Sequence, residues 1–227
     1  MYTWNCTFGK DVFAMDKNKY EAIRLRMERC AEALRRNNFA AECVDSKEEA
    51  LELVEELIPD GATVAVGGSV TLSEVGVLEL LSSGRFNYLD RYAPGLTPEE
   101  RREVFVKSFG CDYYLCSANA VTENGELYNV DGTGNRVAAM LFGPEKVIVI
   151  AGCSKLVKDL DAADERVKAI AAPANAIRLD RNTPCTKTGR CADCRSEGRI
   201  CANKVVFARQ TTPGRITVIL VAEELGY

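Results

Sequence analysis

The sequence predicts an α/β fold in which a mostly parallel sheet is flanked by helices. Short apolar runs rich in β-branched residues alternate with segments of helical periodicity, which is typical of a sheet covered by helices. Polar, glycine-containing loops follow several of these runs. At 227 residues with 47% apolar content, the chain is long enough to bury a full core. We therefore expect one domain over residues 1–227, with a cysteine-rich, metal-binding excursion over residues 182–204 near the C-terminus.

The N-terminal part predicts a long amphipathic helix over residues 16–37. Tyr20, Ile23 and Met27 begin an apolar stripe that recurs at three- and four-residue spacing, with charged residues between its members. We expect this stripe to pack on the core. The first fifteen residues show no clear period and predict an extended arm.

The elements before the middle of the chain alternate between strand and helix. Two helices are expected to begin with a capping box, at Ser46–Glu49 and at Thr97–Glu100, and the second has proline at its first helical position. In order, the pattern predicts a strand at 39–44, a helix at 46–58, a strand at 63–66, a helix at 71–81, a strand at 86–90 and a helix at 97–109.

The second half continues the alternation around one long polar segment. The pattern predicts strands at 113–116 and 146–151, a short helix at 137–142 between them, a helix at 160–171, and strands at 205–209 and 216–221. Residues 119–136, between the first strand and the short helix, predict a polar loop punctuated by glycine. Such a loop between buried strands is where an α/β protein holds a ligand.

Three polar loops, 67–71, 119–136 and 152–155, therefore predict a site for a small anion such as a carboxylate or a phosphate. Glycine lets backbone amides approach an anion, and Arg136 can pair with it bidentately. Alternatively, the first glycine pair only permits a tight turn, and Asn124 begins a hairpin turn. The expected ligand contacts are Gly67, Gly68, Ser69, Thr71, Asn119, Asn124, Gly132, Gly134, Asn135, Arg136 and Lys155.

The composition excludes several kinds of chemistry, because the chain contains no histidine. It cannot form a Ser-His-Asp or Cys-His nucleophile pair or a histidine-containing metal site. Acid–base catalysis would fall to carboxylates, such as Glu123 and Asp131, or to lysine, tyrosine or thiols. With a formal charge of −4 and no long basic stripe, we expect no nucleic-acid partner. The absence of a long apolar run or a signal-peptide pattern predicts a cytoplasmic protein without a membrane span.

Four of the ten cysteines, Cys185, Cys191, Cys194 and Cys201, fall close together in a segment with few other apolar residues. This segment cannot order itself by burial, and four thiolates at such spacing can bind a [4Fe–4S] cluster or zinc. The presence of only one tight Cys-x2-Cys pair favours the cluster over zinc. Two disulfides or free thiols are the other interpretations. The remaining cysteines are expected to be small buried apolar residues.

The central stretch Asn119–Ala139, followed by Gly143–Gly152, resembles the signature of the lactate-utilisation (LUD) domain family. Gly68–Gly76 is similar to the family's earlier strand-to-helix motif, and Gly214–Val221 is similar to its C-terminal strand. The resemblance implies a three-layer α/β fold similar to ribose-5-phosphate isomerase A and the CoA transferases. It also implies a link to oxidation of lactate or related acids.

The sequence departs from the family pattern at two places next to the expected ligand contacts. Ser117-Ala118 stands where the family has Gly-Thr, and Ser154 stands where it has Asn. In addition, Thr122–Gly125 is similar to the Ser-Glu-Asn-Gly motif of class I CoA transferases, whose glutamate carries the acyl group. That similarity implies a nucleophilic role for Glu123.

Three classes of function remain open. The first, which we favour, is an iron–sulfur redox accessory in utilisation of lactate or a related acid, working with redox partner proteins. The second is an enzyme of the CoA-transferase or sugar-phosphate isomerase type that uses Glu123 or Asp131. The third is a binding or regulatory module without catalysis, whose zinc stabilises the fold.

Overall fold

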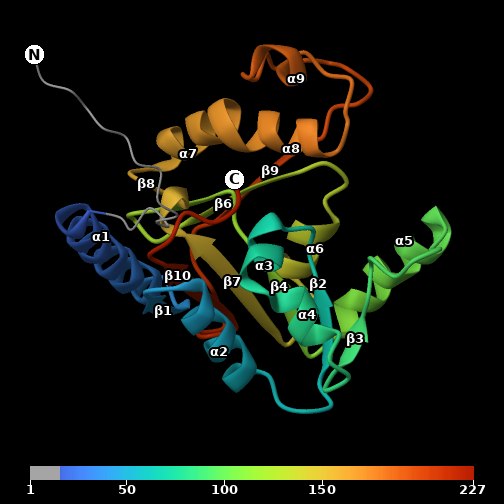
Figure 1. Cartoon of the computed structure of the whole chain (residues 1–227), viewed down its shortest axis with the longest axis horizontal. Helices are drawn as coiled ribbons and strands as arrows, with labels where there is room; N and C mark the ends of the chain where they lie inside the picture. The colour runs from blue at the N-terminus through green and yellow to red at the C-terminus, as the bar shows by residue number, and fades with distance from the viewer. Residues whose placement is uncertain (1–15) are drawn as a thin grey trace, which may run out of the picture.

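The computed structural model describes residues 16–227, and its centre is a six-stranded sheet (Figure 1). The strand order is β1-β10-β7-β4-β2-β3, and every neighbouring pair is parallel. The strands are β1 (Ala40–Val44), β2 (Thr63–Val66), β3 (Asn87–Leu89), β4 (Tyr113–Cys116), β7 (Lys146–Gly152) and β10 (Ile216–Val221). The predicted α/β fold with a mostly parallel sheet is confirmed. The arm predicted for the first fifteen residues lies outside the described residues.

The sheet separates two hydrophobic cores, as the alternation of side chains along a strand requires. In β7, Val147 and Val149 pack into one core, whereas Ile148 and Ile150 pack into the other. The first core includes residues of α1 (Lys17–Arg36) and α6 (Asn135–Leu141). The second includes residues of α2 (Lys47–Leu57), α3 (Val70–Val75) and α4 (Val77–Leu81). The sheet is thus the middle of three layers.

Helix ends follow the capping signals in part. The predicted capping box of α5 (Pro98–Lys107) is complete. In α2, the Ser46 side chain accepts a hydrogen bond from the Glu49 N–H, but the Glu49 carboxylate accepts from the N–H of Asp45. The single helix expected at 71–81 is two helices, because Gly76 at φ 89° interrupts it.

The segment expected to be a polar loop contains two strands of a second sheet, so this part of the prediction is wrong. β5 (Ala120–Thr122) and β6 (Leu127–Asp131) form an antiparallel hairpin. With β8 (Leu156–Val157) and β9 (Asn203–Phe207) they make a sheet in the order β8-β5-β6-β9. The physical reason is burial: Val121 and Leu127 are fully buried in the core shared with α1.

A long helical segment covers the outer side of this second sheet. The helix expected at 160–171 continues further, as α7 (Leu160–Arg166), a π-helical turn (Val167–Ala171) and α8 (Ala172–Arg178). Ala163 and Val167 pack against Ala120 and Tyr128. The short α9 (Cys185–Thr188) follows (Figure 1). Within residues 16–227, none of the helices is long and apolar enough to cross a membrane.

Candidate anion-binding site

A cavity of about 640 Å³ lies at the carboxyl ends of β2, β4 and β7, three neighbouring strands of the parallel sheet. Thr71 from α3 after β2, Ser117 after β4 and Lys155 after β7 contribute buried polar side chains to its lining. Together with Asn119 we call these residues the floor. The loops expected to bind a ligand after three separate strands are therefore brought together, as expected for the carboxyl edge of a parallel sheet.

The outer lining of the cavity is strongly cationic. Its acidic members are Asp131 and Glu197, and Asp131 is already paired with Arg136. A concave surface with an excess of one charge raises the local concentration of oppositely charged ligands. The guanidinium groups that line the cavity above the floor, which we call the cationic rim, belong to Arg91, Arg101, Arg178, Arg181 and Arg199.

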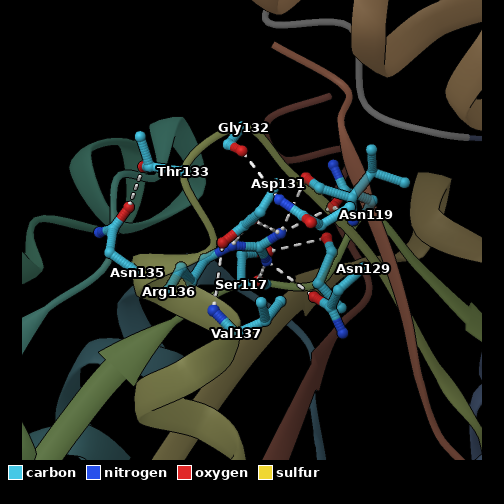
Figure 2. A network of polar contacts seen from close by, with 12 residues as sticks. Ser117, Asn119, Asn129, Asp131, Gly132, Thr133, Asn135, Arg136 and Val137 are labelled. Carbon is cyan, nitrogen blue, oxygen red and sulfur yellow. Dashed lines mark hydrogen bonds and ion pairs between the residues drawn. The ribbon is translucent and has the colours of Figure 1, made fainter.

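Arg136 lies inside the protein wall of the cavity and is only 8% exposed. Figure 2 shows its guanidinium surrounded by acceptors from β6 and from the segment before β5. These acceptors are the side chains of Asp131 (2.9 Å), Asn129 (2.7 Å) and Asn119 (2.9 Å) and the backbone carbonyls of Ser117 and Val130. A guanidinium has five N–H donors, and these five acceptors engage all of them. The expected bidentate contact with a ligand therefore has no free donor in this arrangement.

Asp131 is engaged as fully as Arg136. One carboxylate oxygen accepts from the Arg136 guanidinium, and the other accepts from the N–H of Val137, in the first turn of α6, at 3.1 Å. Asp131 is 8% exposed. Gly67 belongs to the same unit, since a Cβ there would lie 3.0 Å from Cγ of Arg136 and 3.2 Å from Cβ of Cys116. These residues hold the loop and α6 together.

The other expected contacts divide between the cavity surface and the surrounding loops. Gly134, with φ 82°, provides the left-handed residue before α6, and Asn135 accepts a hydrogen bond from the Thr133 hydroxyl at 2.7 Å. Neither lines the cavity, nor does Gly67. The side chain of Ser69 caps α3. The predicted ligand contacts that do line the cavity are Gly68, Ser69, Thr71, Asn119, Gly132, Arg136 and Lys155.

Lys155 is buried on the floor with 2% of its surface exposed. Its Nζ donates hydrogen bonds to Oγ1 of Thr71 at 2.7 Å and to Oγ of Ser117 at 2.8 Å. Burial lowers the pKa of this amine to about 7, and the like charges of Arg166 and Arg136 act in the same direction. Lys155 therefore differs from an ordinary, fully protonated surface lysine.

Glu123 and Asn124 lie in the turn of the β5–β6 hairpin and do not line the cavity. The Glu123 carboxylate pairs with the guanidinium of Arg26 in α1 at 3.0 Å. The Asn37 side chain, at the end of α1, donates to the backbone carbonyls of Asn124 and Gly125, each at 2.9 Å. These contacts join the hairpin turn to α1. They leave Glu123 apart from the groups that face the cavity.

The arginines of the cationic rim were missed from the sequence. Arg91 lies before α5 and Arg101 lies within it. Arg178 ends α8, and Arg199 lies in the cysteine-bearing segment. No local pattern links positions so far apart in the chain. One local signal could have located Arg178. Proline is tolerated in the first turn of a helix, so the sequence around Pro173 is compatible with a helix that extends to Arg178.

The cysteine-bearing segment meets the central motif at the cavity. Glu197, Gly198, Arg199 and Ile200 line the cavity wall. A Cβ on Gly132 would lie 3.2 Å from the carbonyl oxygen of Ile200, and the Ala202 N–H donates to the Asp131 carbonyl at 2.9 Å. The two regions singled out in the sequence therefore form one surface.

The four clustered cysteines are not equally placed. Burial raises the pKa of the Cys201 thiol, and the neighbouring thiols of Cys191 and Cys194 add to the effect. Cys185 is buried, with its Sγ 3.2 Å from the Thr183 hydroxyl. In the described part of the chain, no three cysteine, aspartate or glutamate side chains converge as metal ligands would. The thiols as placed do not form a four-ligand cage, and metal binding stays a prediction.

The fold and this surface define an α/β protein with a cationic cavity at the carboxyl edge of a parallel sheet. Residues 27–221 match the family model described as the LUD domain. The chain therefore belongs to the LUD domain family, as its central motif indicates. A search of curated proteins finds no match.

A comparison with solved structures finds several similar chains. A DUF162 family protein from Deinococcus radiodurans has a TM-score of 0.51 at 14% identity, over 89% of this chain and 98% of that chain. Weaker similarity covers 50% of this chain in two proteins from Chaetomium thermophilum. They are eIF2B beta (TM-score 0.36, 17% identity, 43% of that chain) and eIF2B delta (TM-score 0.35, 21% identity, 49% of that chain).

Proposed function

We propose that this protein binds a small organic anion, a carboxylate or a phosphate, as a component of the utilisation of lactate or a related acid. The observation that carries the proposal is the cationic rim above a floor of hydrogen-bonding side chains. Membership of the LUD domain family supports the link to organic acids. The two carboxylates suggested as catalysts favour this binding role over transfer or isomerase chemistry, because Glu123 pairs with Arg26 and Asp131 with Arg136.

The rim arginines have few acidic partners of their own. Within residues 16–227, Arg91, Arg101, Arg178 and Arg181 form no ion pair, whereas Arg199 pairs with Asp193. Arg178 donates to the neutral side chain of Asn175. The guanidinium of Arg91 stacks over the ring of Phe105, and its buried Nε has no acceptor in that part of the chain. Cations that converge without carboxylates repel one another, and a bound anion offsets this repulsion.

Isothermal titration calorimetry with lactate, pyruvate and inorganic phosphate tests the proposal. We expect at least one of these anions to bind, and Arg178→Ala to weaken its binding about ten- to a hundredfold. This range corresponds to the loss of one or two charge-assisted hydrogen bonds. Arg101→Ala should also weaken binding, because Arg101 lines the same cavity.

Arg102→Ala is the matched control, since Arg102 is also exposed on α5 but does not line the cavity. Binding by the control should equal that of the wild type. The proposal is wrong if none of the three anions binds, or if Arg102→Ala weakens binding as much as the substitutions of rim residues.

For the cysteine-bearing segment we infer a metal-binding role, as a [4Fe–4S] cluster or zinc. The inference rests on the spacing of the four cysteines in the sequence. The thiols would have to move together to bind a metal, since no three of them converge in the described part of the chain. An iron–sulfur centre supplies one-electron transfer, which is suited to a redox accessory, whereas zinc only stabilises the fold.

Metal analysis of anaerobically purified protein separates these possibilities. We expect iron and acid-labile sulfide with broad visible absorption, lost in Cys194→Ser but kept in Cys43→Ser, whose residue lies in β1. Stoichiometric zinc without colour would contradict an electron-transfer role. Absence of any bound metal would contradict both forms of the inference.

A further inference from the structure

We propose that Lys155 is a nucleophilic amine that forms an imine with the carbonyl group of a 2-oxo acid bound in the cavity. The inference rests on the proposed binding of an organic anion and extends it. It names a substrate class, the 2-oxo acids, and the covalent step that this cavity supports.

Lys155 lies at the carboxyl edge of the sheet, where a ligand in the cavity would contact it. It ends the short 3₁₀ helix Cys153–Lys155 directly after β7, which lies between β10 and β4 near the middle of the sheet. Its side chain lies between Thr71 and Ser117, which follow β2 and β4. Three neighbouring strands thus place one amine and two hydroxyl groups on the cavity floor.

The surroundings of Lys155 favour the neutral amine. In the described part of the chain, no carboxylate lies within ion-pair distance of Nζ. The charged groups that act on it most are Arg166 from α7 and Arg136 from α6, which repel a cation, and Glu74 from α3, which attracts one. Glu74 is engaged elsewhere, since its carboxylate accepts the Gly226 N–H at 2.6 Å. An unpaired buried ammonium is unfavourable, so the amine loses its proton near neutral pH.

The hydrogen bonds of the floor leave the lone pair of the neutral amine free. Ser117 donates its hydroxyl proton to the Ala118 carbonyl at 3.3 Å, so its oxygen accepts from Nζ. Thr71 accepts the second amine proton. The C-terminal segment approaches Nζ closely, because a Cβ on Gly226 would lie 3.3 Å from it. The remaining direction is the cavity that Lys155 lines.

A 2-oxo acid matches both parts of this site. Its carboxylate suits the cationic rim, and the adjacent carbonyl carbon is an electrophile for an amine. The Nζ lone pair attacks that carbon, a C–N bond forms, and the carbonyl oxygen takes the proton that the amine loses. The resulting hydroxyl then takes a second proton from water and leaves as water. The product is a protonated imine, whose positive charge faces the carboxylate of the same substrate.

Reductive trapping tests the proposal on the full chain. We expect pyruvate plus sodium cyanoborohydride to add one reduced pyruvyl unit, which peptide mapping locates at Lys155. Lactate lacks the carbonyl group and should add nothing. Lys155→Met should lose the adduct, whereas Lys158→Met, which removes an exposed lysine three residues away, should keep it. Because Lys155 has a pKa of about 7, the initial rate of trapping should reach half its maximum near pH 7.

Each outcome separates this inference from the binding proposal. Calorimetric binding of pyruvate without an adduct would overturn the role of Lys155 and leave anion binding intact. A failure of every anion to bind would overturn the binding proposal itself. An adduct spread over surface lysines, or a rate that rises only near the pKa of ordinary lysines, about 10.4, would also overturn the role of Lys155. Mapping of the wild-type adduct decides the question even if Lys155→Met does not fold.

Discussion

Replacing Arg136 with methionine is expected to destabilise the protein by about 3–5 kcal/mol, the cost of breaking a buried ion pair by removing one partner. The substitution leaves the Asp131 carboxylate buried without its guanidinium. It also leaves the side chains of Asn119 and Asn129 without the donor that they share. Urea denaturation of the wild type and the variant measures the difference in the free energy of unfolding.

Two further variants distinguish the network from a general effect of losing an arginine. Arg36→Met removes an exposed arginine at the end of α1 and should change the free energy of unfolding by less than about 0.5 kcal/mol. The double variant Arg136→Met with Asp131→Asn removes both charges and should recover part of the loss. Equal stability of Arg136→Met and Arg36→Met would contradict a structural role for the network.

Gly125→Ala is expected to cost about 2–5 kcal/mol, because two penalties add at this position. Gly125 has φ 79°, a conformation that costs an L-residue about 1–2 kcal/mol. A Cβ there would lie 2.4 Å from the carbonyl carbon of Ala33 in α1, which adds an overpacking cost of about 1–3 kcal/mol. Thermal or urea denaturation measures the sum.

Gly84→Ala is the matched control for this substitution. Gly84 has φ 89°, but a Cβ there would meet no atom within 4 Å, so only the backbone penalty applies. The difference between the two variants isolates the packing of the hairpin turn on α1. If both variants lose the same stability, the close approach of Gly125 to α1 does not contribute.

These two substitutions give a structural explanation for much of the family motif. Gly125 lets the hairpin turn pack against α1, and Asp131 and Arg136 join β6 to α6. From the sequence, Asp131 was expected to catalyse and Arg136 to contact a ligand, because aspartate and arginine in a polar loop are also typical of binding sites. Residue type cannot distinguish these roles, since a guanidinium binds a protein carbonyl as readily as a ligand.

The order of elements was predictable because it depends on local signals. Apolar runs, capping residues and glycine breaks located the strands of the parallel sheet and the starts of its helices. The second sheet was not predictable in this way. Ala120–Thr122 is short, and its burial depends on α1 and on the helical segment that begins with α7, which come from distant parts of the chain.

The sequence by itself determined the fold class, the family and the absence of histidine chemistry, since each depends on composition or on a contiguous motif. It also predicted a ligand contact at Lys155, a residue that lines the cavity. Only the tertiary structure decided which polar side chains face the cavity. Acceptors from β6 and from the segment before β5 use every donor of Arg136. Lys155 lines the cavity, and rim arginines from separate elements converge above it. Such roles depend on how donors and acceptors meet across distant segments, which no local pattern encodes.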